Sequence, residues 1–445
     1  MTWRPAAVVL VGAGVLALAG AVVGGGPWPW VAAALVVGVT AVVTAVDIAL
    51  AADPRRVRLH REGERAIWLG DSAQVSVTVH NTSSRVLRGS VRDAWVPSAR
   101  AAPYDHDLVL RPNTAARLTT TLTPIRRGDR AAVLVMIRSY GPLRLGFRQP
   151  SRRAATAGTP GWTLRVYPPF SARRFLPEKL ARLRVLDGAT VMRGRGQGTE
   201  FDTLREYVIG DDVRSVDWRA SARRSEVVVR TWRPERDRRV LCVLDTGRTS
   251  AARIGDEPRL DAAIDAALLL ATLAARADDR VDLLAIDTAV RASVTAGRRA
   301  LLPRLVSALA PLTPALVETD FELVTGEVLR RARKRALVVL FTALEPGAVG
   351  EGLLPVLPKL AARHKVVVAA VHDPELVRLS TAPALPNVTA ADVYTAAAAH
   401  RTLAERERVR TVLARSGVEV VDAPVRLFAS RVADTYLAMK AAGRL

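Results

Sequence analysis

The sequence predicts a membrane-anchored α/β protein built from four consecutive parts. Two long uncharged apolar runs stand at the N-terminus. A stretch of alternating polar and apolar residues follows, and short apolar segments then alternate with helical patterns. We therefore expect a transmembrane helical hairpin at 1–54, a small β-sandwich at 55–167 and an acid- and arginine-rich signature segment at 168–239. Residues 240–445 are expected to form a Rossmann-like, mainly parallel sheet with helices on both faces.

The composition is sufficient for several hydrophobic cores and bears on which classes of partner the chain can bind. Of the 445 residues, 49% are apolar, and the formal net charge is +22. Only five of the 65 basic residues are lysines, and no basic motif is interleaved with aromatic residues as in single-strand binders. We therefore expect no nucleic-acid partner and regard anionic lipid headgroups as the simpler use of the charge. The single cysteine, Cys242, lies in an apolar run, which predicts a buried thiol.

The first 54 residues are predicted to cross the membrane twice. The apolar runs at 6–23 and 30–52 are each close to the length that a hydrocarbon core requires, and Asp47 is expected at the interface. Glycines, prolines and tryptophans at 24–30 indicate a tight turn. A cleaved signal peptide is the weaker alternative, because a second span follows at once. The arginines from Arg55 onward place both chain ends and the soluble part on the cytoplasmic side of the cell membrane.

Residues 55–167 show the period of two that is typical of half-buried strands. Strands are predicted at 74–80, 117–122 and 131–138, with turn clusters between them. Several short strands separated by turns indicate a small β-sandwich. We interpret this part as a spacer or interaction module.

The signature segment interleaves acids, arginines and aromatic residues between positions 194 and 239. One interpretation is a structural latch in which arginine forks bind carboxylates. The other is a set of carboxylates that binds a metal or acts in acid–base chemistry, namely Glu200, Glu206, Asp211, Asp212 and Asp217. The latch is favoured, because arginines match the acids nearly one for one and the segment contains no histidine.

The spacing of this segment resembles the signature of the DUF58 family. The residues that carry the resemblance are Glu200, Phe201, Leu204, Arg205, Glu206, Tyr207, Gly210, Asp211, Asp212, Arg214, Asp217, Trp218, Ser221 and Arg223. It extends from the membrane hairpin to about Pro374 and more weakly beyond. The resemblance implies a von Willebrand A-like domain and association with a MoxR-type AAA+ ATPase. It favours the function of an adaptor or scaffold over that of an enzyme.

The remainder of the chain alternates strands with helices. Apolar strands are predicted at 240–244, 281–286, 337–341, 366–371 and 418–421, with a partner strand at 290–295 and helices at 260–275, 301–309, 353–363 and 402–415. Fully apolar strands predict a mainly parallel sheet buried on both faces. Ligands of such sheets bind beyond the carboxyl ends of the strands, where Asp245, Asp287 and Thr342 stand. The helical tail at 428–445 is expected to pack on this sheet.

The run from Asp245 to Thr249 is similar to the Asp-x-Ser-x-Ser motif that holds Mg²⁺ in many von Willebrand A domains. On that resemblance Asp245, Thr249 and Thr319 would form a degenerate metal site. Gly247 replaces the first serine, and Ala343 stands where a coordinating aspartate is expected. We therefore expect Mg²⁺ binding to be weakened or lost, and Asp245 to hydrogen-bond loop amides instead.

These features together predict a non-enzymatic, membrane-anchored adaptor whose cytoplasmic α/β domain binds protein partners, with a MoxR-type AAA+ ATPase as the expected one. Two alternatives stay open. One is a metal-dependent hydrolase that uses the carboxylates from Glu200 to Asp217. The other is arginine-mediated binding of anionic lipid or nucleic acid. The six histidines are scattered, and no Ser-His-Asp or Cys-His set is recognisable.

Overall fold

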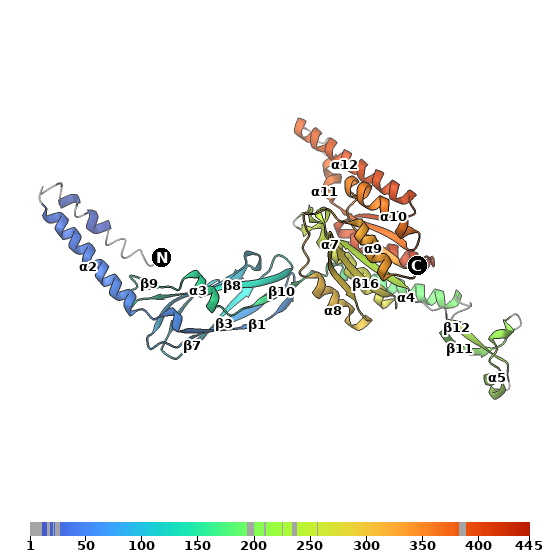
Figure 1. Cartoon of the computed structure of the whole chain (residues 1–445), viewed down its shortest axis with the longest axis horizontal. Coiled ribbons are helices and arrows are strands. Elements are labelled where there is room, and N and C mark those ends of the chain that lie inside the picture. The colour runs from blue at the N-terminus through green and yellow to red at the C-terminus, as the bar shows by residue number, and fades with distance from the viewer. Residues whose placement is uncertain are drawn as a thin grey trace. The chain divides into compact units, whose positions relative to one another are not determined.

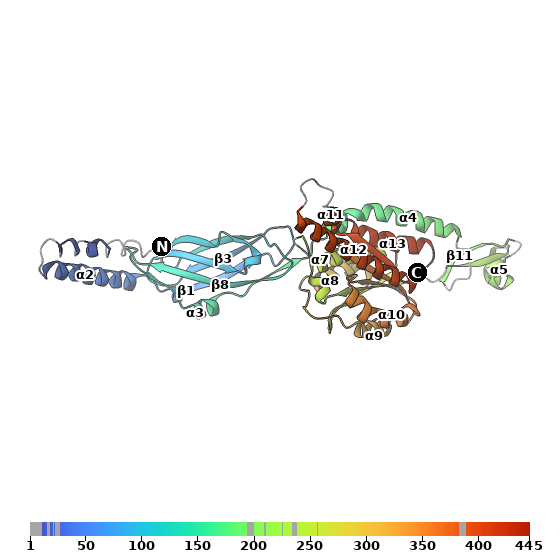
Figure 2. The same ribbon diagram turned by 90° about the horizontal axis from the view of Figure 1, so that it is seen from above.

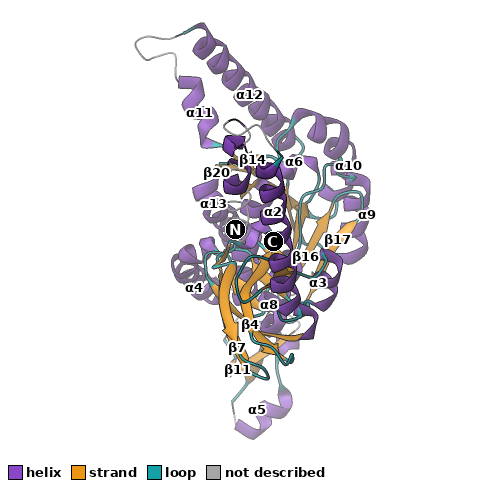
Figure 3. Cartoon of the chain, turned by 90° about the vertical axis from the view of Figure 1, so that its left-hand side faces the viewer, coloured by secondary structure: helices purple, strands orange, loops and turns teal. Residues whose placement is uncertain are grey.

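The computed structural model describes residues 11–15, 18–20, 22, 27–193, 200–208, 211–224, 226–233, 238–255, 257–381 and 389–445. The chain divides into two compact units, Met1–Tyr167 and Pro168–Leu445 (Figure 1). The first unit is dominated by strands, and the second mixes strands with many helices. Figure 3 distinguishes the helices and strands of the chain by colour.

One helix in the described part of the chain is long and apolar enough to cross a membrane. Helix α2 (Trp28–Leu50) has 23 residues, one of them charged, and most of its side chains are exposed. At 1.5 Å per residue its length is about 34 Å, close to the thickness of a hydrocarbon core. Half of the earlier apolar run at 6–23 lies outside the described residues. Among the described residues one span is found, where two were predicted.

The start of α2 differs from the expected turn at 24–30. The helix already begins at Trp28, with Pro29 in its first turn. Proline is compatible with the first turn of a helix, because the N–H it lacks would have no intrahelical acceptor there. The Pro-Trp pairs therefore initiate the helix.

The first unit contains two sheets that pack face to face. The strands are β1 (Val57–Gly63), β2 (Ala66–Trp68), β3 (Ala73–Asn81), β4 (Leu87–Trp95), β5 (Ala101–Ala102), β6 (Asp105–Leu110), β7 (Ala115–Leu122), β8 (Gly128–Tyr140), β9 (Phe147–Arg148) and β10 (Thr163–Tyr167). Their orders are β1-β3-β7-β5 and β2-β10-β8-β4-β6, with β9 paired to β8. Val77 and Val79 of one sheet share a core with Val91 and Ile137 of the other. The turns η1 (Pro54–Arg56) and η2 (Pro97–Ala99) and helix α3 (Arg152–Gly158) complete this unit.

The second unit begins with the turn η3 (Ser171–Phe175) and helix α4 (Leu176–Arg193), followed by a separate two-stranded sheet. Strands β11 (Glu200–Glu206) and β12 (Val228–Arg233) are antiparallel, and η4 (Val213–Ser215) and α5 (Trp218–Arg224) lie between them in the sequence. We call the described residues 200–208, 211–224 and 226–233 the signature lobe. They make no strand pairing with the larger sheet of this unit.

The larger sheet has six strands in the order β17-β16-β13-β18-β19-β20. They are β13 (Arg239–Asp245), β16 (Arg280–Ile286), β17 (Val290–Thr295), β18 (Leu337–Phe341), β19 (Lys365–His372) and β20 (Glu419–Pro424). All neighbours are parallel except the edge strand β17. The predicted mixed α/β architecture is confirmed to this extent. Cys242 is fully buried in β13, and this burial raises the pKa of its thiol to about 12.

Helices cover both faces of the six-stranded sheet. They are α6 (Arg248–Ala251), α7 (Arg259–Arg276), α8 (Arg298–Leu309), α9 (Phe321–Arg331), α10 (Leu354–Ala361), α11 (Pro374–Thr381), α12 (Ala390–Arg415) and α13 (Val425–Ala441), with the π-helical turn η5 (Ala348–Leu353) and the small strands β14 (Arg253–Ile254) and β15 (Glu257–Pro258). Helices α9 and α10 lie on one face, and α4 and α13 on the other (Figure 2). The C-terminal helix packs on the sheet, with Phe428 edge-on to Phe341. Helix α12 begins 12 residues before the predicted 402–415, because Thr389 and Asp392 form a capping box at its start.

Candidate functional site

The sheet has one point where its strand order reverses. The chain runs from β13 to β16 and β17 in one direction, and β18, β19 and β20 then follow on the other side of β13. Ligands of open α/β sheets bind outside the carboxyl ends of the strands at such a point. Asp245 ends β13 and Thr342 directly follows β18, so these two residues occupy the reversal point.

Asp245 is the centre of a buried hydrogen-bond network. The Oδ1 atom of its carboxylate accepts from Thr319 Oγ1 at 2.5 Å and from the Gly247 N–H at 2.8 Å. Its Oδ2 atom accepts from Thr342 Oγ1 at 2.6 Å and Thr249 Oγ1 at 3.0 Å. We call Asp245, Thr249, Thr319 and Thr342 the Asp245 hydroxyl cluster. The sequence pointed to three of these residues as one site and recognised Thr342 only by its place after a strand.

Gly247 is required by the packing of this cluster. A Cβ atom at position 247 would lie 2.2 Å from Thr319 Oγ1 and 2.9 Å from the Val317 carbonyl oxygen. The Thr319 hydroxyl therefore fills the space that a serine side chain at position 247 would need. This explains physically why the chain departs from the Asp-x-Ser-x-Ser pattern here.

Ion pairs surround the cluster. Arg248 pairs with Glu318 at 2.6 Å, and this hydrogen-bonded partner raises the pKa of Arg248. Arg259 pairs with Glu345 at 2.7 Å and donates to the Thr249 carbonyl oxygen at 3.2 Å. Each of these two guanidinium groups thus has its own glutamate partner.

Asp287, at the end of β16, belongs to a neighbouring network. Its carboxylate accepts from Thr246 Oγ1 at 3.0 Å, Arg291 Nε at 2.7 Å and the Ala289 N–H at 3.1 Å. Burial opposes ionisation of this carboxyl group, but the hydrogen bonds from these three donors outweigh burial and lower its pKa. Asp287 therefore has its own partners and does not join the Asp245 hydroxyl cluster.

The donor set around Asp245 does not fit a Mg²⁺ site. Mg²⁺ binding in proteins relies on near-ideal octahedral oxygen coordination, usually with one or two carboxylates. Here one carboxylate is present, and each of its oxygens already accepts two hydrogen bonds. Among the described residues no group of three or more His, Cys, Asp and Glu side chains could hold a metal ion. The arrangement instead stabilises the loops that form this edge of the sheet.

In the signature lobe the carboxylates bind arginines and backbone amides. Asp211 accepts from Arg205 at 2.5 Å and from the Val208 N–H at 3.0 Å. Asp217 accepts from the Ala220 N–H at 3.0 Å, which caps α5, and from Arg230 Nε at 2.8 Å. The side chains of Asp211 and Asp217 are 21% and 14% exposed.

Further contacts connect the short elements of the lobe. Ser221 Oγ donates to the Asp217 carbonyl oxygen at 2.8 Å and accepts from the Val228 N–H at 2.9 Å, which joins α5 to β12. Asp212 caps η4 by accepting from the Arg214 N–H at 3.0 Å. Gly210 and the side chains of Glu200 and Phe201 lie outside the described residues.

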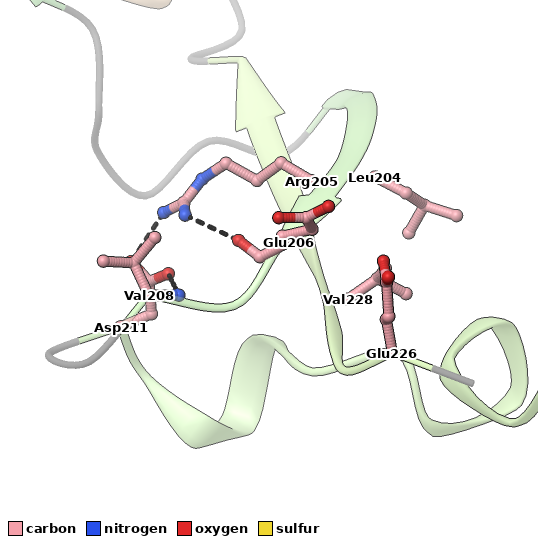
Figure 4. A pocket seen from close by; sticks show the side chains of 7 residues that line it. All are labelled: Leu204, Arg205, Glu206, Val208, Asp211, Glu226 and Val228. Carbon is pink, nitrogen blue, oxygen red and sulfur yellow. Dashed lines mark hydrogen bonds and ion pairs between the residues drawn. The ribbon is translucent and has the colours of Figure 1, made fainter. Parts of the chain in front are cut away.

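This framework presents apolar and acidic side chains to solvent. Trp218 is 66% exposed, Val208 61% and Val213 60%. A pocket of about 560 Å³ is lined by Leu204, Arg205, Glu206, Val208, Asp211, Glu226 and Val228 (Figure 4). In contrast to Asp211, the exposed carboxylates of Glu206 and Glu226 have no ion-pair partner among the described residues. Tyr207 is half-buried and Arg223 is exposed.

The sequence of this region matches the model of a domain family. The family described as "Protein of unknown function DUF58" matches residues 203–419, so the chain carries a DUF58 domain that includes most of the signature lobe and most of the six-stranded sheet. The predicted resemblance is confirmed in this region. The match starts after the first unit, later than the expected start at the membrane hairpin, and continues past Pro374 to residue 419.

Curated relatives share part of this domain. Uncharacterized proteins of Mycobacterium tuberculosis and Mycobacterium bovis are 29% identical to the chain over 192 residues, or 41% of this chain and 58% of theirs. The chain therefore spans little more than half the length of these relatives.

Solved structures resemble the chain only distantly. The CARDB domain of a Pyrococcus furiosus protein, in complex with di-metal ions, is 14% identical with a TM-score of 0.19, covering 25% of this chain and 86% of that domain. A β-glucosidase from Listeria innocua is 13% identical with a TM-score of 0.16, covering 25% of this chain and 16% of the enzyme.

Proposed function

We propose that the protein is a membrane-anchored, non-enzymatic adaptor whose cytoplasmic α/β domain is of the von Willebrand A type and binds protein partners, with a MoxR-type AAA+ ATPase as the expected one. The observation that carries this proposal is the exposure of three large apolar side chains of the signature lobe, Trp218, Val208 and Val213. Exposed aromatic and apolar side chains on a preformed framework are typical of protein-binding surfaces.

The six-stranded sheet supports the von Willebrand A interpretation. Its strand order has an antiparallel edge strand, and its reversal point carries an aspartate ringed by threonine hydroxyls. Because the cluster is closed by hydrogen bonds, we propose that recognition does not pass through a metal ion here. The binding surface is therefore assigned to the signature lobe.

Helix α2 supports membrane anchoring, and the arginines that follow it support a cytoplasmic position for both units. The other span of the predicted hairpin, at 6–23, belongs to this proposal as well. In this arrangement the chain would hold its partner at the inner face of the cell membrane.

The hydrolase alternative receives less support from the lobe. Asp211, Asp212 and Asp217 are engaged by arginines or backbone amides. Among the acidic side chains of the lobe that the structure describes, Glu206 and Glu226 are left without an ion-pair partner. Two acidic side chains with no histidine and no further metal-ligating side chains beside them in the described lobe are weak candidates for catalysis.

The proposal is tested by affinity isolation of the detergent-solubilised full chain from its own cells, followed by mass spectrometry. Wild type is compared with Trp218→Ala and with the matched control Tyr394→Ala, whose side chain is 78% exposed in α12. We expect an AAA+ ATPase with wild type and control but not with Trp218→Ala. Equal recovery with all three would exclude Trp218 as the contact. Absence of any ATPase, together with divalent-dependent hydrolysis by the purified chain, would favour the hydrolase.

A further inference from the structure

The C-terminal end of α2 is fixed to the β8–β9 loop, residues 141–146, by buried hydrogen bonds. The carboxylate of Asp47, which is 1% exposed, accepts from the Leu143 N–H at 2.7 Å through Oδ1. Its Oδ2 atom accepts from the Leu145 N–H at 2.9 Å and the Gly146 N–H at 3.1 Å. Three backbone amides of one loop thus converge on the charged side chain of this apolar helix.

Two glycines allow the loop to approach the helix this closely. A Cβ atom at Gly141 would lie 2.2 Å from Asp47 Cγ, and one at Gly146 would lie 2.4 Å from Ile48 Cγ1. Arginines from the sandwich also bind the end of the helix, since Arg85 donates to the Ala49 carbonyl oxygen at 2.5 Å. Strand β9 lies against this end of α2 (Figure 1). The helix and the loop therefore form one rigid junction.

The position of Asp47 determines where the loop lies. Asp47 is three residues before the last residue of α2, or about 5 Å along the helix axis. A carboxylate near hydrocarbon is costly unless its oxygens are hydrogen-bonded. If α2 spans the membrane, the loop must accompany Asp47 to the level of the membrane interface.

The loop and the helix enclose an apolar groove of about 170 Å³. Its walls are Val42, Val43, Val46, Asp47 and Leu50 of α2 with Pro142 and Leu143 of the loop. From Val42 to Leu50 the groove follows the helix for about 12 Å. Leu143 is 63% exposed at the loop tip. Around the junction Arg55, Arg56 and Arg144 are exposed and have no ion pair among the described residues.

We propose that the β8–β9 loop enters the membrane interface beside α2, and that the groove holds an acyl chain of an anionic phospholipid. The groove wall on α2 belongs to the apolar surface with which this helix would face lipid. The contact of α2 with the bilayer and the contact of the groove with an acyl chain are therefore continuous. Arg55, Arg56 and Arg144 supply positive charge for the headgroup. This inference rests on the proposed anchoring by α2 and adds a second, loop-based contact that fixes the sandwich to the membrane.

The test uses the full chain in vesicles of phosphatidylcholine and phosphatidylglycerol. An environment-sensitive fluorophore is attached through Leu143→Cys, through Val39→Cys at an exposed position of α2, or through Ile125→Cys at an exposed position of the β7–β8 loop, at the other end of the long strand β8. The native Cys242 is fully buried, and unmodified protein controls for its labelling. Quenching by phospholipid with a spin label near the headgroup is compared with quenching by iodide in the aqueous phase. For position 39, in the middle of α2, the spin label is placed near the end of the acyl chain instead.

We expect the label at position 143 to lose most of its fluorescence to spin-labelled lipid and little to iodide, and the label at position 125 to show the opposite. Lipid quenching at 39 but not at 143 would overturn this inference and leave the anchor intact. No lipid quenching at 39 would overturn the anchor itself. A label at 143 shielded from both quenchers would mean that protein, such as the first apolar run or a second copy, fills the groove. Quenching at 143 that is unchanged without phosphatidylglycerol would refute the anionic preference.

Discussion

Thr342 donates a hydrogen bond of 2.6 Å to Asp245 across the point where the strand order of the six-stranded sheet reverses. The two residues are 97 positions apart in the sequence and both are buried. This contact lies at the edge of the sheet where open α/β sheets usually bind ligands. The reversal point of this sheet is therefore occupied by the protein's own side chains.

Introducing Gly247→Ser tests this packing. Because a Cβ atom at this position overlaps the Thr319 hydroxyl, we expect the substitution to lower the free energy of unfolding by about 1–3 kcal/mol, as overpacking commonly does. Urea unfolding of the second unit measures the change. The double variant Gly247→Ser with Thr319→Ala should recover part of the loss. Gly326→Ser, in open space on α9, is the control, and an equal loss there would show that the effect is not specific to the cluster.

The Asp245 hydroxyl cluster should not bind Mg²⁺, so Mg²⁺ should not change the thermal stability of the protein. Since both carboxylate oxygens are occupied by hydrogen-bond donors, millimolar Mg²⁺ should leave the melting temperature unchanged. Asp245→Asn should lower stability by about 1–3 kcal/mol, because the amide nitrogen cannot accept the hydrogen bonds that one carboxylate oxygen accepts. Differential scanning calorimetry with Mg²⁺ and with chelator measures both effects. A Mg²⁺-dependent rise in melting temperature that disappears in Asp245→Asn would instead establish a metal site.

The sequence predicted the parallel sheet well because its strands are apolar on both faces and its helices fall between them. It also placed Asp245, Asp287 and Thr342 at strand ends, since periodicity alone locates those ends. It could not show that Thr342 and Thr319 turn toward Asp245 while Asp287 binds Arg291, because side-chain partners depend on loop conformation. The role of Gly141 and Gly146 was invisible for a similar reason, as they contact a helix about 95 residues earlier in the chain.

The stability of the second unit should depend on pH through Asp265. Burial raises the pKa of this carboxyl group from its ordinary value of 3.8 to about 6, although the Ala172 N–H donates to it at 3.0 Å. The folded protein then holds the proton more tightly than the unfolded chain does. The stabilisation is present below pH 4 and is lost as the pH rises through 6. At about 1.4 kcal/mol per pKa unit, the free energy of unfolding should fall by about 3 kcal/mol over this range.

Unfolding by urea between pH 4 and pH 7.5 measures this dependence. Asp265→Asn should flatten it, because the amide does not titrate, whereas the exposed-site control Glu322→Gln should retain the wild-type slope. The same slope in Asp265→Asn as in wild type would assign the dependence to other groups.

The stability of the signature lobe should fall in acid, because Asp217 becomes protonated. The hydrogen bond from the Ala220 N–H, followed by that from Arg230, lowers the pKa of Asp217 below its ordinary value. A lowered pKa means that this contribution is present above pH 4 and is lost as the pH falls through the folded pKa. Amide hydrogen exchange at Ala220, corrected for the intrinsic rate, should show protection at pH 7 that declines below pH 4.

Asp217→Asn separates the cap from the ion pair at neutral pH. The amide oxygen can still accept from the Ala220 N–H, but the charged partner of Arg230 is gone, so protection should fall only partly. Arg230→Gln should have a similar effect, because it removes the same ion pair from the other side. If exposure of Trp218 on an intact lobe carries partner binding, both variants should weaken recovery of the ATPase less than Trp218→Ala does. Full loss of recovery in either variant would instead make the Asp217–Arg230 ion pair itself the feature on which recognition depends.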